Sequence, residues 1–225
     1  MSEPIRFTSR QGDQIDGALA VPAGSQLVPG VVVVQEWWGL TDHIRGFADR
    51  WAAAGMLALA PDLYRGTVAT SAEQAGGLMQ GLDRVRALAD LGAAVDTLRA
   101  HPRCNGAVIV TGYCMGGALS LGLASTMADL AAVISFYGVP QTADLTAVRA
   151  PVQMHVAQHD DWVTPALAEA TATTIRSGGA SVEVHTYDAS HAFCNDTRPE
   201  VFHAASAALA WQRAVSFARA HAQPG

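Results

Sequence analysis

The chain has 225 residues, of which 50% are hydrophobic, and its formal net charge is −6. This length predicts a single domain, spanning residues 1–225, with a sizeable buried core. A mildly acidic chain without a basic run lacks the charge pattern that binds nucleic acid or an anionic membrane surface. No apolar stretch reaches the ~18 residues that a membrane-spanning helix needs.

The three cysteines are Cys104, Cys114 and Cys194. They are odd in number and lack metal-type spacing, so we expect free thiols instead of a disulfide framework. The polar start "MSEPIRFTSRQGDQ" has no apolar core typical of a signal peptide. We therefore expect a cytoplasmic protein, a monomer or small homo-oligomer, that needs no cofactor or metal.

The first half of the chain alternates strand and helix patterns. Residues 5–24 predict two short strands joined by a turn at Gly12-Asp13. The β-branched run "GVVVVQE" (30–36) is typical of a strand buried on both faces of a parallel sheet. Helical spacing follows over 41–55, then a strand over 56–64, an irregular segment over 66–77 and a long helix ending near His101.

The second half continues the alternation. It predicts a strand over 106–114 followed directly by a helix of small residues, and then strands over 131–138, 151–161 and 181–191. A terminal helix is expected from Val201 to His221, with Phe202, Leu209 and Phe217 on its apolar stripe. Strands that alternate with helices favour an α/β fold, a mostly parallel sheet covered on both faces, here with a short N-terminal hairpin.

Chemically active side chains follow several of these strands. In such sheets ligands bind beyond the carboxyl ends of the strands, so residues directly after each strand are the candidates for a site. They are Glu36 and Trp37, Asp62, Cys114, Asp160 and Asp161, and His191. The order Cys, Asp, His is that of the α/β-hydrolase triad, with cysteine in place of serine.

The stretch "TGYCMGG" (111–117) resembles a nucleophile elbow. Gly112 and Gly116 flank Cys114 at the two positions where a sharp strand-to-helix turn brings backbones into close approach. A cysteine at a helix N-terminus also has its thiolate favoured by the helix dipole. The backbone N–H groups of Met115 and Trp37 are the candidate donors to an oxyanion.

Structural interpretations of the same residues stay open. A cysteine between glycines can be a small buried packing residue. His155 and His159 with the neighbouring acids suggest a metal site, although His155 falls inside an apolar strand and no second ligand cluster accompanies it. Cys194 can be a second reactive thiol, or it can line a pocket.

Over nearly its whole length the chain resembles the dienelactone hydrolase family of α/β-hydrolases. The resemblance rests on "VVVVQEWWGL", "ALAPDLYRG", "VTGYCMGGAL", "VISFYG", "VAQHDDWVTP" and "DASHAFCN". It implies Cys114 as nucleophile, His191 as general acid/base and Asp160 as the carboxylate that orients it, with Asp161 as the fallback. It also implies that Glu36 partners the resting thiol and helps to form the thiolate.

The sequence departs from the family where a substrate carboxylate is bound. The family places an arginine four residues past the histidine, where this chain has Asn195, and "TSAEQAGGLMQGL" (70–82) offers neither the second arginine nor the expected tyrosine. Arg65, Arg84 and Arg198 are near in sequence only. We therefore expect Trp38, Phe193 and Asn195 to contact a substrate in a more apolar pocket.

The resemblance implies a hydrolase that cleaves a small-molecule ester, enol-lactone or thioester through a covalent acyl-enzyme. Two alternatives stay open. One is a flavodoxin-like cysteine enzyme of the amidotransferase kind, which also combines a glycine-flanked cysteine with a strand-end glutamate. The other is a non-catalytic binding protein on a hydrolase fold, suggested by the missing arginines.

Overall fold

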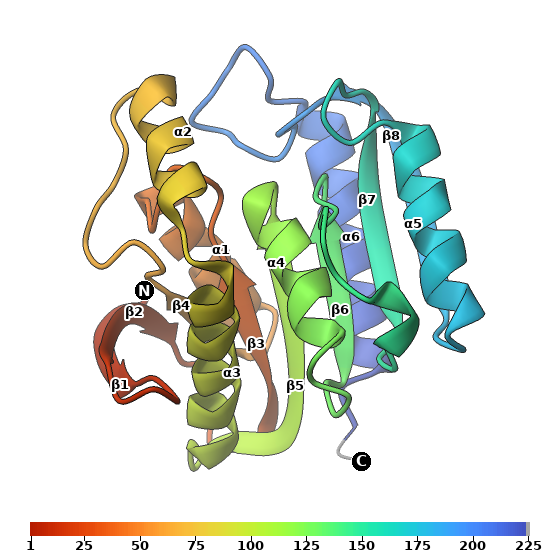
Figure 1. Ribbon diagram of the computed structural model, residues 1–225. Helices are drawn as coiled ribbons and strands as arrows, with labels where there is room; N and C mark the ends of the chain where they lie inside the picture. The colour runs from red at the N-terminus through yellow and green to blue at the C-terminus, as the bar shows by residue number, and fades with distance from the viewer. Residues whose placement is uncertain (224–225) are drawn as a thin grey trace.

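The computed structural model describes residues 1–223, and its strands form one sheet (Figure 1). The order across this sheet is β1-β2-β4-β3-β5-β6-β7-β8. In chain order the strands are β1 (Glu3–Thr8), β2 (Gln14–Ala20), β3 (Val28–Val34), β4 (Leu57–Pro61), β5 (Cys104–Tyr113), β6 (Ala132–Phe136), β7 (Val152–His159) and β8 (Val182–Ser190).

The sheet is parallel except at its N-terminal edge. Strand β1 pairs antiparallel with β2, and β2 pairs antiparallel with β4, whereas every pairing from β4 to β8 is parallel. The predicted N-terminal hairpin therefore forms, and it extends the parallel sheet. This arrangement confirms the predicted α/β fold.

Helices cover both faces of the sheet, as Figure 1 shows, with α3, α4 and α5 in front and α1 and α6 behind. The helices are α1 (Asp42–Ala53), α2 (Ala72–Gly81), α3 (Arg84–Ala100), α4 (Met115–Ala124), α5 (Pro165–Ser177) and α6 (Ala204–Ala220). The core is accordingly split into two apolar layers, one on each side of the strands. Within residues 1–223, no helix has both the length and the hydrophobicity needed to cross a lipid bilayer.

The central strands are buried on both faces, as their composition requires. Val31, Val32, Val33 and Val34 of β3 are fully buried, and their side chains divide between the two layers. Helix α4 is built largely of small and aliphatic residues and is buried on nearly every side. The strand β5, which leads into α4, is thereby fixed in the middle of the molecule.

Three helical predictions need correction. The segment 66–77, expected to be irregular, contains the start of α2, whose cap Ser71 accepts a hydrogen bond from the Gln74 amide. The glycines of α2 lower its helix propensity, and for this reason the sequence pattern did not indicate a helix. Helix α5 was not predicted, although Thr164 caps it and a proline opens it.

The third correction concerns the terminal helix. It begins at Ala204, three residues after the predicted start at Val201. Its buried face includes Ser206, Ala210, Ala214 and Phe217, whereas Phe202 and Leu209 are 36% and 43% exposed. Small residues pack this helix against the sheet. The predicted apolar stripe, which was chosen for its large side chains, therefore lies partly on the solvent-exposed face.

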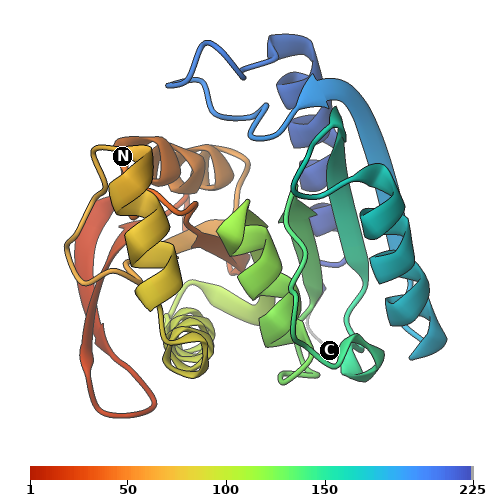
Figure 2. The same cartoon turned by 45° about the horizontal axis from the view of Figure 1, so that its top comes forward.

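The carboxyl ends of the parallel strands meet at one end of the molecule. Figure 2 brings this end forward, with α2 and the segment 191–203, which joins β8 to α6, both lying there. The strand-end residues identified in the sequence gather at this end.

Candidate active site

The strand register places the candidate residues side by side. Val34 of β3 pairs with Gly112 of β5, so Glu36 and Cys114 each lie two residues beyond a paired position. Tyr113 pairs with Phe136 of β6, which puts Tyr137 next to Cys114.

The same rule applies at the other edge of the sheet. His159 of β7 pairs with Ser190 of β8, so Asp160 and His191 directly follow a matched pair. Parallel pairing alone therefore brings residues that are up to 155 positions apart, Glu36 and His191, to one end of the sheet.

Cys114 lies at the tip of a strained turn. Its backbone has φ 54° and ψ −116°, and it immediately precedes α4. A Cβ built on Gly112 would lie 2.1 Å from the Gly116 carbonyl oxygen, and one built on Gly116 would lie 2.3 Å from the Val34 carbonyl oxygen. Only glycine fits at either position, so the close approach predicted for an elbow is present.

His191 is held by a buried carboxylate. Its Nδ1 lies 2.7 Å from Oδ2 of Asp160, while Oδ1 of Asp160 accepts the backbone N–H groups of Trp162 and Val163 at 2.8 and 2.9 Å. Burial raises the pKa of Asp160, but these hydrogen bonds and the charge of His191 outweigh it, and the pKa lies below its ordinary value. Asp161, the fallback, is exposed.

The imidazole of His191 favours its charged form. Burial lowers its pKa, but hydrogen bonds to Asp160 and Cys114, together with the negative charges on both partners, raise it to about 10. The half-buried thiol thus faces a histidine that is oriented by an ionised carboxylate.

Glu36 is 2% exposed and has two partners, neither of which is the cysteine. Its Oε2 accepts a hydrogen bond from Asn195 Nδ2 at 2.7 Å, and its Oε1 lies 3.5 Å from the Tyr137 hydroxyl. Burial raises the pKa of Glu36, and the nearby His43 charge and the Asn195 hydrogen bond offset this rise only in part. Among residues 1–223 no hydrogen bond joins Glu36 to Cys114, which differs from the thiol partnership that we expected.

Two of the predicted substrate contacts, Phe193 and Asn195, are buried. Phe193 is fully buried, and its ring packs 5.4 Å from that of Tyr137 and 5.1 Å from that of Tyr187, measured between centroids. Full burial leaves this ring no exposed surface with which to contact a substrate. Asn195 is 3% exposed and donates to Glu36. Its role was missed because a contact across 159 residues leaves no local sequence signal.

Three tryptophans surround the site, and we call Trp37, Trp38 and Trp162 the aromatic rim. The Trp37 ring lies 5.3 Å from that of Trp38 and 5.9 Å from that of Trp162, in edge-to-face geometry. Trp162 also stacks on the His191 imidazole at 6.2 Å and is 63% exposed. Trp38, the third predicted substrate contact, is half-buried in this rim.

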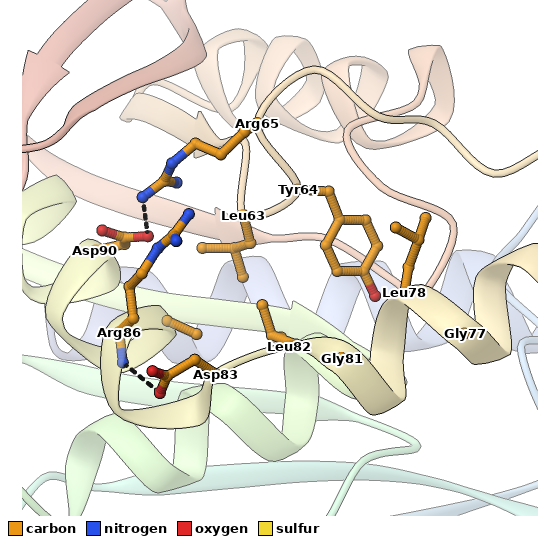
Figure 3. A pocket seen from close by; sticks show the side chains of 11 residues that line it. Leu63, Tyr64, Arg65, Gly77, Leu78, Gly81, Leu82, Asp83, Arg86 and Asp90 are labelled. Atoms are coloured by element: carbon orange, nitrogen blue, oxygen red, sulfur yellow. Dashed lines mark hydrogen bonds and ion pairs between the residues drawn. The ribbon is translucent and has the colours of Figure 1, made fainter.

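Of the three nearby arginines, Arg65 and Arg84 are bound elsewhere. Figure 3 shows Arg65 turned toward Asp90, its guanidinium 2.6 Å from the carboxylate, at a hollow of about 250 Å³. Tyr64 lines the same hollow and donates its hydroxyl to Met115 Sδ at 3.3 Å. Arg84 donates to Thr142 at the surface.

Arg198 lies closer to the candidate site. It lines a second hollow, of about 240 Å³, together with Trp38 and Asn195. Its Nε donates to Glu200 at 2.8 Å, and its guanidinium lies 5.7 Å from the centre of the Trp38 ring. The carboxylate of Glu200 thus already occupies one edge of this guanidinium.

The remaining candidate groups are held in other ways. Cys194 is buried, and burial together with the nearby Glu36 charge raises its pKa, which opposes thiolate formation. His155 is bound by Tyr187 and Gln153, whereas His159 contacts Asp188. Because the two histidines face different partners, they do not converge as metal ligands would.

Comparison with known proteins agrees with this architecture. The family model described as the dienelactone hydrolase family matches residues 15–222. The chain belongs to the dienelactone hydrolase family. The predicted family membership is therefore confirmed, and with it the hydrolase class and the α/β-hydrolase fold.

Individual relatives are similar over almost their full length. Protein usf of Aquifex pyrophilus is 34% identical, with 96% of this chain and 97% of that protein covered. Carboxymethylenebutenolidase 1 of Cupriavidus pinatubonensis is 31% identical, with 92% of each covered. The crystal structure of a dienelactone hydrolase-like promiscuous phosphotriesterase from metagenomic libraries has a TM-score of 0.88 at 27% identity, covering 99% of this chain and 98% of that one.

The family assignment excludes one of the two alternatives that the sequence left open. A flavodoxin-like cysteine enzyme is excluded, because the chain has the α/β-hydrolase fold of its dienelactone hydrolase relatives, including the antiparallel hairpin at the edge.

Proposed function

We propose that this dienelactone hydrolase-family chain hydrolyses a small carboxylic ester, enol-lactone or thioester with Cys114 as nucleophile. The observation that carries the proposal is the strained conformation of Cys114 at the start of α4, beside a His191 that Asp160 orients. Strain of this kind persists only where the surrounding structure imposes it, and it clusters at functional sites.

The first half of the reaction forms an acyl-enzyme. The Cys114 proton moves to His191, and the thiolate attacks the carbonyl carbon of the substrate. The backbone N–H groups of Met115 and Trp37 are the proposed donors to the oxyanion. The Met115 amide opens α4 and has no acceptor inside the helix. His191 then gives its proton to the leaving oxygen or sulfur as the tetrahedral adduct collapses.

The second half regenerates the enzyme. His191, neutral after the first half, takes a proton from water as that water attacks the thioester carbon. The second tetrahedral adduct expels the Cys114 thiolate and releases the acid. Asp160 holds the imidazole in place throughout and stabilises its charged form. Because thiolate leaves more easily than a plain alkoxide, we expect activated esters and enol-lactones to react faster than alkyl esters.

Turnover of para-nitrophenyl acetate tests this proposal. We expect Cys114→Ala and His191→Ala each to lower kcat/KM by more than about 10³-fold, because either change removes a member of a unit that acts together. An acetyl adduct on Cys114, trapped at low pH and located by peptide mass spectrometry, is the expected intermediate. Wild-type turnover by either variant, or no turnover of any ester, lactone or thioester by the wild type, contradicts the proposal and favours a binding protein.

A further inference from the structure

Asn195 holds the Glu36 carboxylate through a short, buried contact. Its Nδ2 lies 2.7 Å from Glu36 Oε2, and both side chains belong to residues that are at most 3% exposed. The second partner of Glu36, the Tyr137 hydroxyl, is at 3.5 Å, the outer limit of a hydrogen bond. Asn195 is therefore the main hydrogen-bond donor to this carboxylate.

The amide of Asn195 is itself fixed in one orientation. Its Oδ1 accepts two hydrogen bonds from Thr197, one from the backbone N–H at 3.1 Å and one from the hydroxyl at 2.6 Å. Because an oxygen must face these two donors, the NH₂ group faces Glu36. The backbone is fixed too, since the Asn195 amide closes a turn onto Ala192, which has φ 64°.

Glu36 would otherwise lie within easy reach of the nucleophile. The register places Glu36 and Cys114 two residues beyond a matched pair on neighbouring strands. In the present arrangement, however, no hydrogen bond within residues 1–223 joins Glu36 to Cys114, whereas Cys114 lies near enough to His191 to raise the pKa of that imidazole. A carboxylate next to a thiol accepts its proton as a hydrogen bond and opposes its ionisation through like charge.

We propose that Asn195 is a positioning residue that holds Glu36 away from Cys114, so that the thiolate–imidazolium pair forms before any substrate binds. The proton leaves Cys114 Sγ, forms an N–H bond on His191, and no other reactant takes part. This inference rests on the proposed role of Cys114 as the nucleophile. It assigns to Asn195 the task of keeping the nucleophile ready, in place of contacting the substrate.

Alkylation of the substrate-free protein by iodoacetamide, followed against pH by peptide mass spectrometry, measures how much of Cys114 is present as thiolate, separately from the other cysteines. We expect Asn195→Ala to release Glu36 toward the thiol and to slow alkylation about tenfold at a pH below the midpoint of the wild-type profile, since there a rise of one pKa unit leaves about a tenth of the thiolate. The pH profile should move upward by the same amount. A folded Asn195→Ala variant with the wild-type profile overturns the proposal.

A second substitution separates positioning from general damage to the fold. In the double variant Asn195→Ala/Glu36→Gln the competing charge is gone, so we expect alkylation at the same pH, below the midpoint of the wild-type profile, to return to within about twofold of the wild type. Alkylation as slow in the double variant as in Asn195→Ala overturns the proposal. Asn105→Ala, an asparagine whose Nδ2 donates to Ala222 instead, is the matched control and should leave the profile unchanged.

Thr197→Val provides the test if Asn195→Ala does not fold. It keeps Asn195 but removes one of the two donors that orient its amide, so we expect a slowing of about twofold to threefold in the same direction. An unchanged profile in this variant then overturns the proposal. The assay uses no ester, so a wild-type protein that alkylates as expected yet hydrolyses nothing contradicts the proposed function and leaves the role of Asn195 supported.

Discussion

The elbow (Gly112–Gly116) and the aromatic rim (Trp37, Trp38 and Trp162) lie at the same end of the sheet but are built in opposite ways. At the elbow, backbone touches backbone, and a single added methyl group at Gly116 would lie 2.3 Å from a carbonyl oxygen. At the rim, large side chains meet edge to face, and Trp162 is 63% exposed. We therefore expect the elbow to tolerate no residue larger than glycine at its two glycine positions, whereas the rim should tolerate replacement of its side chains.

This difference separates the chemistry from the choice of substrate. The position of Cys114, the proposed nucleophile, depends on close backbone contacts that only a glycine side chain, a single hydrogen, permits. The rim, which we propose as the region that meets a substrate, includes the exposed ring of Trp162, whose replacement disturbs little of the fold. We infer that substitutions at the elbow act through folding, and substitutions at the rim act through substrate preference.

The largest expected effect is that of Gly116→Ala. The new Cβ would collide with the carbonyl oxygens of Val34 and Gln35, so we expect a loss of more than about 4 kcal/mol in the free energy of unfolding, or no folded protein. Thermal and urea denaturation measure this loss. Gly46→Ala, in α1 with no atom within 4 Å of its Cβ, is the matched control and should be neutral or slightly stabilising. A folded Gly116→Ala with wild-type stability contradicts the comparison.

A smaller effect, of opposite sign, is expected for Glu36→Gln. Burial raises the pKa of Glu36, so the unfolded chain loses this proton first, and native stability falls as the pH rises above about 4.5. Glutamine keeps an acceptor for Asn195 without the buried charge. We expect a gain of about 1 kcal/mol at pH 8 that disappears near pH 4, measured by urea denaturation across this range. A gain that does not depend on pH contradicts this explanation.

The smallest expected effect on stability is that of Trp162→Ala. The ring is mostly exposed, so the free energy of unfolding should change by no more than about 0.5 kcal/mol. Its stacking on His191 and its edge-to-face contact with Trp37 should nevertheless favour aromatic esters. We expect the ratio of kcat/KM for para-nitrophenyl benzoate to that for para-nitrophenyl acetate to fall about threefold to tenfold. An unchanged ratio shows that the rim does not select the substrate.

The parts of the site that could be predicted from sequence are those fixed by strand ends. The sequence indicates where each parallel strand ends, because an apolar run stops just before Glu36, Cys114, Asp160 and His191. The topology of the parallel sheet then brings these strand ends together. The glycines around Cys114 are informative for a related reason, because a required absence of Cβ is visible in the sequence itself.

Side-chain contacts between distant segments could not be predicted. The hydrogen bond from Asn195 to Glu36 depends on how a turn after β8 folds back over β3, and neither segment signals the other. The burial of Phe193 was missed for the same reason. Helices α2 and α5 were missed because their sequences are rich in small or polar residues, where capping by Ser71 and Thr164 is the main local signal.

Helix α4 has a consequence for the timing of motions in this protein. It is enclosed on nearly all sides, and Cys114 is the residue that caps its N-terminus. Amide hydrogens in such a helix exchange with solvent only when the whole molecule opens, whereas exposed loops exchange through brief local openings. The proposed nucleophile therefore lies at the end of a helix that we expect to open only with the whole molecule.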